Sequence, residues 1–476
     1  MDFLQKIKNF FTIKKTGGGK MNRKNLIENI IDAYNINLNF DIEKYYNDLD
    51  KWNNIYKNTP YWKNENTNTL NIGASICTEI AQTATIELKL NVNAKNEDIK
   101  ERLEAIFNDL LDDLTENVEI CSALGGVIFK PFTQGNNILV DCITPLNFIP
   151  LQFDGKNNII GALFFEQIEY NDKFYIRIEK HEFVKNIYVV TNNLYTSITP
   201  NTLGQKIPIN TLDIFANLKE EAIYYNLDKP LFTYLKTPIK NNIDYSNPLG
   251  ISHFYRAIEL IKNVDEQYTR LLWEYEGSEL AVHIEESFLI THEEQNNTYN
   301  FDIAKRRNRL YRKLNTDTQE NFLEVFAPNI RDTSIINGLN EILKKIENTC
   351  GLVHGTFSNA ETEARTATEI KLSKQRNYIT ITSYQKKLKK VFNDLLYIFK
   401  NLLYYMGEYT DKEEVYLLVD FDDSVITDIA EEFSRRLILH QKGLIKDEEL
   451  RAWYMGETEE EAKENIPPKI IEYEIE

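Results

Sequence analysis

The sequence predicts a mixed α+β protein that is predominantly helical, and three observations support this fold class. Apolar residues recur every three to four positions over most of the chain, which is the period of an amphipathic helix. Between residues 127 and 195 the period changes to two, in short β-rich runs separated by Gly, Asn and Asp turns. The chain has 476 residues, more than a single hydrophobic core usually holds, so we expect about two to four structural units.

The composition is typical of a folded protein that is not exported. Hydrophobic residues make up 42% and charged residues 27%, and no window approaches the roughly 18 apolar residues that a membrane span requires. At the N-terminus, Phe3, Ile7 and Phe10 share one helical face, as in interfacial anchors and in short packing helices. We favour a packing helix or a frayed terminus, because this segment has neither an h-region nor a cleavage site. We therefore expect no membrane partner.

Common cofactor and metal motifs are absent from the sequence. The four cysteines form no CxxC pair, so we expect buried thiols and neither a disulfide framework nor a zinc site. The segment TGGGK lacks the upstream Gly and the following Ser or Thr of a phosphate loop. His181 and Glu182 begin an HExxH pattern that fails at Lys185, which favours a surface strand pair. We expect no cofactor and no metal.

The first half of the chain predicts helices followed by a β unit. Residues 22 to 58 have a helical pattern, and the aromatic residues near its end are interpreted as a packing anchor because few basic residues are interleaved with them. Residues 69 to 118 predict two helices around a short strand, and the second helix has a clean apolar stripe. The period-two region of residues 127 to 195 then predicts an antiparallel β unit.

Two helices with narrow apolar stripes follow the β unit. The first is predicted to begin at about Ile251, and its apolar residues recur at a spacing of about 3.5, interrupted by Asp265. A run of about 25 residues would be roughly 38 Å long. The second stripe runs from Ile335 to Ile346. Such narrow stripes predict packing against neighbouring helices.

A mixed insert, residues 278 to 330, separates these two helices and contains a basic cluster. The cluster is electropositive enough to grip an acidic protein surface or phosphates, and a solvated helix face would have the same composition, so both interpretations stay open. Its basic residues are Lys305, Arg306, Arg307, Arg309, Arg312 and Lys313.

The C-terminal part predicts one very long helix and then acidic helices. No Gly or Pro occurs between Gly355 and Gly407, so this segment predicts a helix of about 40 residues, roughly 60 Å long. The β-branched run YITITSY is its least helical part. From Asp422 onward the sequence reads as acidic helices with breaks at Gly443 and Gly456.

One pair of residues could support nucleophilic catalysis. Cys350 and His354 are four positions apart and would act as a nucleophile and its base on one helical turn. Gly351 and Gly355 disfavour a continuous helix there, so we favour a buried Cys at a helix end and an unrelated His. Since no other catalytic motif is present, we expect no enzyme activity.

Several phrases occur in a specific order from about residue 45 onward: WNNIYKNTPYW, LNIGASICTEIA, GGVIFKPF, ITPLNFIPLQFD, NPLGISHFYRAIELIKNVDEQY, ARTATEIKLSKQRNYITITSYQ and HQKGLIKDEELRAWYMGETEEEA. These phrases and the order of the predicted parts resemble the portal proteins of tailed bacteriophages, especially the branch found in phages of Gram-positive bacteria. The resemblance covers most of the chain. It implies a portal-type fold with wing, stem, clip and crown, assembled as a ring.

The resemblance also divides the chain into parts. They are an N-terminal helical segment (1–60), the wing (61–250), a stem helix (251–276), the clip (277–333), a returning stem helix (334–350), a tunnel loop (351–365), a long wing helix with a following strand (366–421) and crown helices (422–476).

The function implied by the resemblance is that of a channel at one capsid vertex, through which genomic DNA is packaged and ejected. The expected location is the virion, and the host cytoplasm during assembly. Because the terminase supplies the energy, no cofactor is implied. The expected partners are other copies of this chain, in rings of about twelve, the major capsid and scaffolding proteins, the terminase large subunit, the head-completion (connector) protein, and double-stranded DNA passing through the channel.

Three groups of residues gain expected roles from the resemblance. The basic cluster is expected to dock partners of the clip. Contacts with DNA are expected from the tunnel-loop residues Thr356, Ser358, Asn359, Glu361, Glu363 and Arg365. Packing in the stem is expected from Ile258, Ile261, Tyr268, Leu272, Leu339 and Ile342.

The acidic charge balance is compatible with DNA that slides past the protein. With 73 acidic and 55 basic residues the formal charge is −18, which disfavours tight wrapping of nucleic acid. Twelve copies would carry roughly −216, and an acidic channel would repel the DNA backbone over short, screened distances. Two alternatives stay open: another phage head or tail structural protein, and a nucleic-acid-processing enzyme that uses Cys350 and His354.

Overall fold

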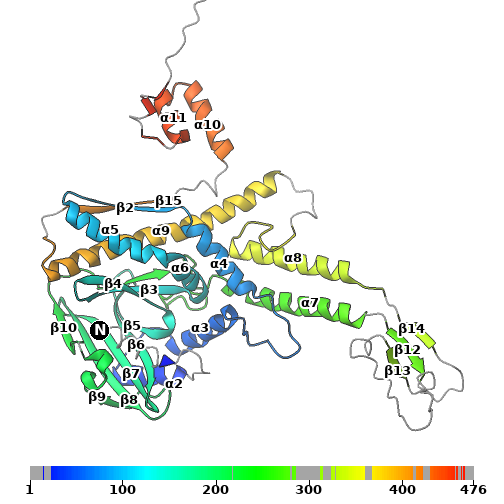
Figure 1. The fold of residues 1–476 in the computed structure, drawn as a ribbon, viewed down its shortest axis with the longest axis horizontal. Coiled ribbons are helices and arrows are strands. Elements are labelled where there is room, and N and C mark those ends of the chain that lie inside the picture. The colour runs from blue at the N-terminus through cyan, green and yellow to red at the C-terminus, as the bar shows by residue number, and fades with distance from the viewer. Residues whose placement is uncertain are drawn as a thin grey trace, which may run out of the picture.

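We describe the protein from a computed structural model. It describes residues 14–15, 23–216, 218–278, 281–285, 311–314, 323–326, 329–359, 367–410, 414–421, 429–455, 457–458, 462–463 and 465–466. The described part is a mixed α+β body from which one pair of helices projects (Figure 1). The predicted mixed α+β class is confirmed, while the ring and its division into wing, stem, clip and crown stay predictions.

A seven-stranded sheet forms one side of the body. Its main path is β1-β6-β7-β8-β10, while β5 pairs with β6 and β9 with β8. The meander of β6, β7 and β8 turns at Asn171–Asp172 and at Lys185–Asn186, and all four residues have positive φ. Two-residue turns of this kind match the twist of antiparallel strands. The strands are β1 (Lys14–Lys15), β5 (Phe148–Phe153), β6 (Ile159–Tyr170), β7 (Lys173–Val184), β8 (Ile187–Ser197), β9 (Gln205–Ile207) and β10 (Glu221–Tyr224).

The region predicted as one β unit is in fact divided between two sheets. β3 (Gly126–Gln134) and β4 (Asn137–Ile143) form a hairpin, and β11 (Thr233–Lys236) pairs with the free edge of β3. The chain then passes through a short 3₁₀ turn, Pro145–Asn147, before β5 joins the larger sheet. A period of two identifies strands but not their partners, which explains why the sequence did not predict this division.

Helices cover these sheets. The second helix predicted between residues 69 and 118 is interrupted at Asp113, where α5 ends and α6 begins. A strand pair of β2 (Leu88–Ala94) and β15 (Val415–Phe421) lies beside α5 (Figure 1). The helices of this half are α2 (Arg23–Ala33), α3 (Ile42–Tyr56), α4 (Ile72–Thr85), α5 (Glu97–Asp112) and α6 (Leu114–Leu124).

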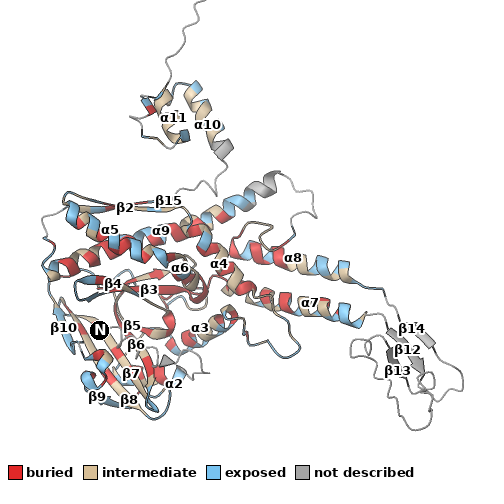
Figure 2. Ribbon diagram, in the orientation of Figure 1, coloured by how far each residue is buried: buried red, intermediate tan, exposed pale blue. Residues whose placement is uncertain are grey.

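The long helix α9 (Ala367–Met406) runs through the centre of the body. Its 40 residues confirm the predicted length, and the run YITITSY is helical despite its β-branched residues. Ile381 and Tyr384 of that run are buried, and Figure 2 shows buried residues along much of the helix. Burial in the core therefore outweighs local propensity at this point.

Two antiparallel helices, α7 (Ile258–Gly277) and α8 (Asp332–Cys350), project from the body as a hairpin (Figure 1). The predicted start of the first helix at Ile251 is wrong, because residues 251–254 are not helical. Gly250 lies against the backbone of Gly125, where an added Cβ would come within 1.8 Å of the carbonyl oxygen. The backbone N–H of His253 donates to the Ser122 carbonyl, so tertiary contacts hold this segment outside a helix.

A three-stranded sheet lies between α7 and α8 in the sequence, and it sits beyond the free end of the hairpin (Figure 1). β12 (Ala281–Glu285) is the central strand, parallel to β13 (Tyr311–Leu314) and antiparallel to β14 (Leu323–Phe326). Two C-terminal helices, α10 (Ile429–Gln441) and α11 (Asp447–Met455), contact each other. Helices were predicted from Asp422 onward, and these two confirm the helical part of that prediction.

Candidate functional site

The α7–α8 hairpin contains all six residues predicted to pack in the stem. Ile261 is buried, and the other five are half-buried. Ile346 of α8 and Val264 of α7 are fully buried. The outer surface still carries large exposed side chains, namely Trp273, Tyr275 and Ile336, which are 64%, 41% and 43% exposed. The hairpin therefore has apolar surface that the single chain does not cover.

An ion pair closes the hairpin at its free end. Glu274, near the end of α7, is buried, and Arg331 precedes α8. The Arg331 guanidinium donates from Nε and Nη2 to the two carboxylate oxygens at 3.1 and 2.8 Å, and its backbone N–H adds a third bond. These bonds hold the pKa of Glu274 below its ordinary value. The bidentate geometry holds the end of α7 next to the start of α8, where the chain continues to the small sheet and returns from it.

The residue predicted to interrupt the α7 stripe has a specific partner. Asp265 is buried, and its carboxylate accepts from Trp62 Nε1 and from the backbone N–H of Leu70, both at 2.9 Å. Thr269, one turn later, accepts from the backbone N–H of Asn68 at 2.9 Å. Burial raises the pKa of Asp265. Asp265 thus ties the loop between α3 and α4 to the base of the hairpin.

A second buried carboxylate, Glu347 of α8, organises the start of the predicted tunnel loop. It accepts from the backbone N–H groups of Phe357 and Ser358 at 2.7 Å and of Gly355 at 3.2 Å. Its Oε2 lies 2.9 Å from Ser358 Oγ and 2.9 Å from His354 Nδ1. Residues 351–359 therefore fold back over the end of α8. Charge-assisted bonds of this number compensate for burying the carboxylate.

The helix itself ends with a glycine in the left-handed region. Gly351 has φ +69, and an added Cβ would come within 2.2 Å of Thr380 Oγ1 on α9. The backbone N–H groups of Gly351 and Leu352 both return to the Glu347 carbonyl. Glycine is favoured at this position because other residues rarely adopt the left-handed conformation and lack the room here. The loop thus leaves α8 in a defined direction.

Cys350 and His354 do not form a catalytic pair. The His354 ring lies against Glu347 and Ser358. Burial raises the pKa of the Cys350 thiol to about 12, and a protonated thiol is a poor nucleophile. The Cys350 carbonyl instead lies 2.7 Å from Nε2 of the buried His253. The predicted buried Cys at a helix end is confirmed.

The predicted loop contacts occupy different environments. Thr356 is half-buried and donates to the Val353 carbonyl, whereas Asn359 is exposed. Ser358 was predicted to contact DNA. In the single chain it is buried, and both its hydroxyl and its backbone N–H donate to the Glu347 carboxylate. Three further predicted contacts lie outside the described residues: Glu361, Glu363 and Arg365.

Two residues of the basic cluster fall on the small sheet. Arg312 and Lys313 lie in β13, so at these positions the chain is a strand and the alternative of a solvated helix face is wrong. They pair with His283 and Ile284 of β12 in parallel register. The cluster members outside the described residues are Lys305, Arg306, Arg307 and Arg309.

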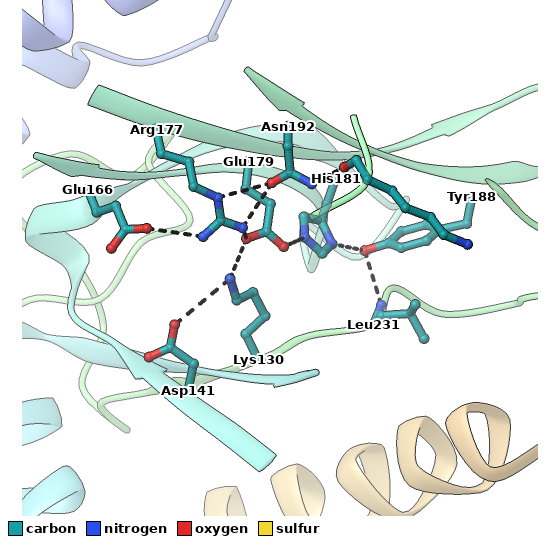
Figure 3. Close-up of polar contacts among 10 residues, drawn as sticks. Lys130, Asp141, Glu166, Arg177, Glu179, His181, Tyr188, Asn192 and Leu231 are labelled. Carbon is teal, nitrogen blue, oxygen red and sulfur yellow. Dashed lines mark hydrogen bonds and ion pairs between the residues drawn. The ribbon is translucent and has the colours of Figure 1, made fainter. Parts of the chain in front are cut away.

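A buried charge network lies between the β3–β4 hairpin and the meander (Figure 3). At its centre, the Glu179 carboxylate lies 2.6 Å from Lys130 Nζ, 2.7 Å from Arg177 Nη2 and 2.8 Å from His181 Nε2. The three cationic or N–H partners keep the pKa of Glu179 well below its ordinary value despite burial. Arg177 also reaches Glu166 at 3.1 Å. The network cross-links the two sheets.

His181 in this network was predicted to lie on the surface, and that prediction is wrong. Tyr188 Oη accepts from the Leu231 backbone N–H, so its own hydroxyl is assigned as donor to His181 Nδ1 at 2.8 Å. Nε2–H is then left to donate to Glu179. Burial lowers the pKa of His181, so the ring stays neutral. Each of these groups is already engaged, which favours a structural role.

Two classes of site are not found among the described residues. No group of three or more His, Cys, Asp or Glu side chains there is arranged to hold a metal ion. In the same part of the chain, no helix combines the length and the apolar character needed to cross a membrane.

Comparison with known proteins gives one match over nearly the whole chain. Residues 22–467 match a family model described as phage portal protein, SPP1 Gp6-like. No curated protein matches the chain significantly.

Proposed function

Because the chain belongs to the SPP1 Gp6-like family of phage portal proteins, we propose that it forms the ring-shaped channel at one capsid vertex through which DNA is packaged and ejected. The family match over residues 22–467 is the observation that carries this proposal. Portal proteins of this family are structural components of the virion. The protein would work without catalysis, docking the terminase motor and later the head-to-tail connector.

The hairpin and its sheet supply the parts that such a channel needs. In this proposal α7 and α8 are the stem, the sheet of β12, β13 and β14 is the clip, and residues 351–365 are the tunnel loop. The remaining body is the wing, and α10 and α11 belong to the crown. The basic cluster, of which Arg312 and Lys313 lie in β13, would dock the motor and the connector.

The uncovered apolar surface of the stem supports assembly with other copies. Trp273, Tyr275 and Ile336 are exposed on the single chain. In a closed ring each copy meets a neighbour on both sides, so these side chains would pack against the adjacent hairpins. We expect about twelve copies, as the resemblance to portal proteins implies.

Mass photometry and negative-stain microscopy of the purified full chain test this proposal. Twelve copies of the 55.8 kDa chain give a particle of about 670 kDa with a continuous axial channel. Trp273→Glu should shift the population towards smaller species, because it places a charge in the contact between copies. Ile198→Glu is the matched control, since Ile198 is 80% exposed and lies outside the hairpin.

Two outcomes would contradict the proposal. A chain that stays monomeric at high concentration would exclude a self-assembling ring. A ring with no continuous axial channel would favour a different phage head or tail structural protein.

A further inference from the structure

A cleft of about 1060 Å³ opens in the body, away from the stem and its sheet. It lies between α9, the turn that joins β5 to β6, and the segment around β11. Six lysines line it and only three aspartates, although acidic residues outnumber basic ones in the chain as a whole. The lysines are Lys156, Lys229, Lys236, Lys240, Lys387 and Lys390.

The aspartates of the cleft leave part of this positive charge uncompensated. Asp154 accepts from the backbone N–H groups of its own turn, at residues 156 and 158. Asp394 pairs with Lys229 at 2.7 Å. The third aspartate, Asp228, is exposed and makes none of the ion pairs found among the described residues. Of the three carboxylates, Asp154 therefore binds its own turn and Asp394 neutralises one lysine.

Of the six lysines, only Lys229 forms an ion pair in the described part of the chain, and three of the other five matter most here. Lys236, Lys240 and Lys387 take part in none of the ion pairs found in the described part of the chain, and Lys236 Nζ donates only to the Pro248 carbonyl. Burial, together with the nearby ammonium groups of Lys387 and Lys240, lowers the pKa of Lys236 to about 8. Lys387 and Lys240 thus repel Lys236, and an anion bound among these side chains would relieve that repulsion.

The rest of the lining suits a peptide better than a nucleic acid. Ile159, Phe232 and Val391 of the lining are buried, but Tyr245 is 76% exposed and offers apolar surface, with its ring centre 5.9 Å from Lys240 Nζ. Such surface accepts apolar side chains, whereas duplex DNA is too wide to enter a cleft of this volume.

We propose that this cleft binds an acidic peptide segment of another protein chain. Carboxylates of the peptide would contact Lys236, Lys240 and Lys387, and a neighbouring apolar side chain would lie on Tyr245. The lining residues are on the body, so the site uses none of the side chains assigned above to stem packing or to motor docking.

Fluorescence anisotropy with the full chain tests this proposal. The probe is a short fluorescein-labelled peptide that alternates glutamate with leucine, and the competitors are inorganic phosphate and a short DNA duplex. Exposed ion pairs contribute about threefold each, so Lys240→Gln with Lys387→Gln should weaken binding about tenfold. The matched control is Lys386→Gln with Lys389→Gln, because these exposed lysines of α9 do not line the cleft.

A loss of affinity in the cleft variant alone supports the proposal. Equal losses in both variants would mean general charge attraction and would overturn it. Displacement of the peptide by the duplex at comparable concentration, with the same loss in the cleft variant, would overturn it in favour of a nucleic-acid site. Displacement by phosphate at comparable concentration would reduce the site to one for small anions and would also overturn it.

Discussion

At the residue scale, the most informative side chain is Glu347, whose role has no local signal in the sequence. In the last turns of α8, an acidic residue resembles an ordinary solvated charge, and its position near the helix C-terminus is unfavourable. The structure buries it completely, because its hydrogen-bond partners come from the loop that follows. A helical period predicts which face is apolar but not which polar residue will meet a returning loop.

Replacing this carboxylate should free the start of the loop. In Glu347→Ala the backbone N–H groups of Phe357 and Ser358 lose their acceptor, so we expect the free energy of unfolding to fall by about 3 kcal/mol. Hydrogen exchange of these two amides should also become faster in the variant, relative to exchange of the amides in the core of α8. Chemical unfolding and mass-resolved hydrogen exchange would measure both effects.

Glu341→Ala provides the control for this variant. Glu341 lies on the same helix, is exposed, and pairs with Lys344 at 2.7 Å. Its removal should leave loop exchange unchanged. If Glu347→Ala behaves like Glu341→Ala, the loop is held by other contacts.

His253 makes stability depend on pH. Burial lowers its pKa to about 4, whereas an unfolded imidazole titrates near pH 6.5. Protonation therefore favours the unfolded chain: stabilisation is complete above about pH 6.5 and is lost as the pH falls towards 4. Between pH 7 and pH 5 we expect a loss of about 2 kcal/mol from this group.

Chemical unfolding of the wild-type chain and of His253→Gln at both pH values would test this. The variant should show a smaller pH dependence, though not a flat one, because the buried His181 has a lowered pKa as well. Identical pH dependence in the two proteins would exclude His253 as the titrating group.

At the element scale, strongly periodic segments were predictable and their ends were not. α8 and α9 lie close to their predicted positions, since each combines a long apolar face with few breaks. The start of α7 was misplaced because Gly250 and His253 are held by residues far away in the sequence. Helix ends depend on such contacts, which periodicity does not report.

The small sheet provides the prediction at this scale, and it rests on the proposed function. Charge reversal at Arg306, Arg307 and Arg309 should weaken binding of the terminase large subunit or the connector by about tenfold, because docking uses opposite charge. The ring should stay intact, since in the sequence these residues belong to the insert between the two proposed stem helices and not to the helices themselves. Pull-down assays and mass photometry would measure the two effects separately.

Charge reversal at Lys173 and Lys206 is the control, because both are exposed on the seven-stranded sheet. Unchanged partner binding in the arginine variant would show that the cluster is an ordinary solvated surface. A loss in both variants would point to general charge repulsion.

At the scale of the whole molecule, the order of the parts could be predicted and their pairings could not. The sequence predicted helices, a β unit, a helix pair with an insert, and a long helix in the right succession. It did not predict that β11 joins β3, or that Asp265 reaches Trp62. These contacts link segments far apart in the chain, and a single sequence carries no record of them.

The pairing of β2 with β15 has a consequence for biosynthesis. The strands are flanked by Lys95 and Glu414, which are 319 positions apart and meet in the folded chain. The segment between the two strands must be translated before β15 can pair with β2, so the β2 edge stays unpaired during that time. An unpaired edge recruits other strands, so nascent chains on one messenger are exposed to mispairing during this interval. Completion of this strand pair therefore depends on β15, and a product truncated before β15 would expose the unpaired edge of β2.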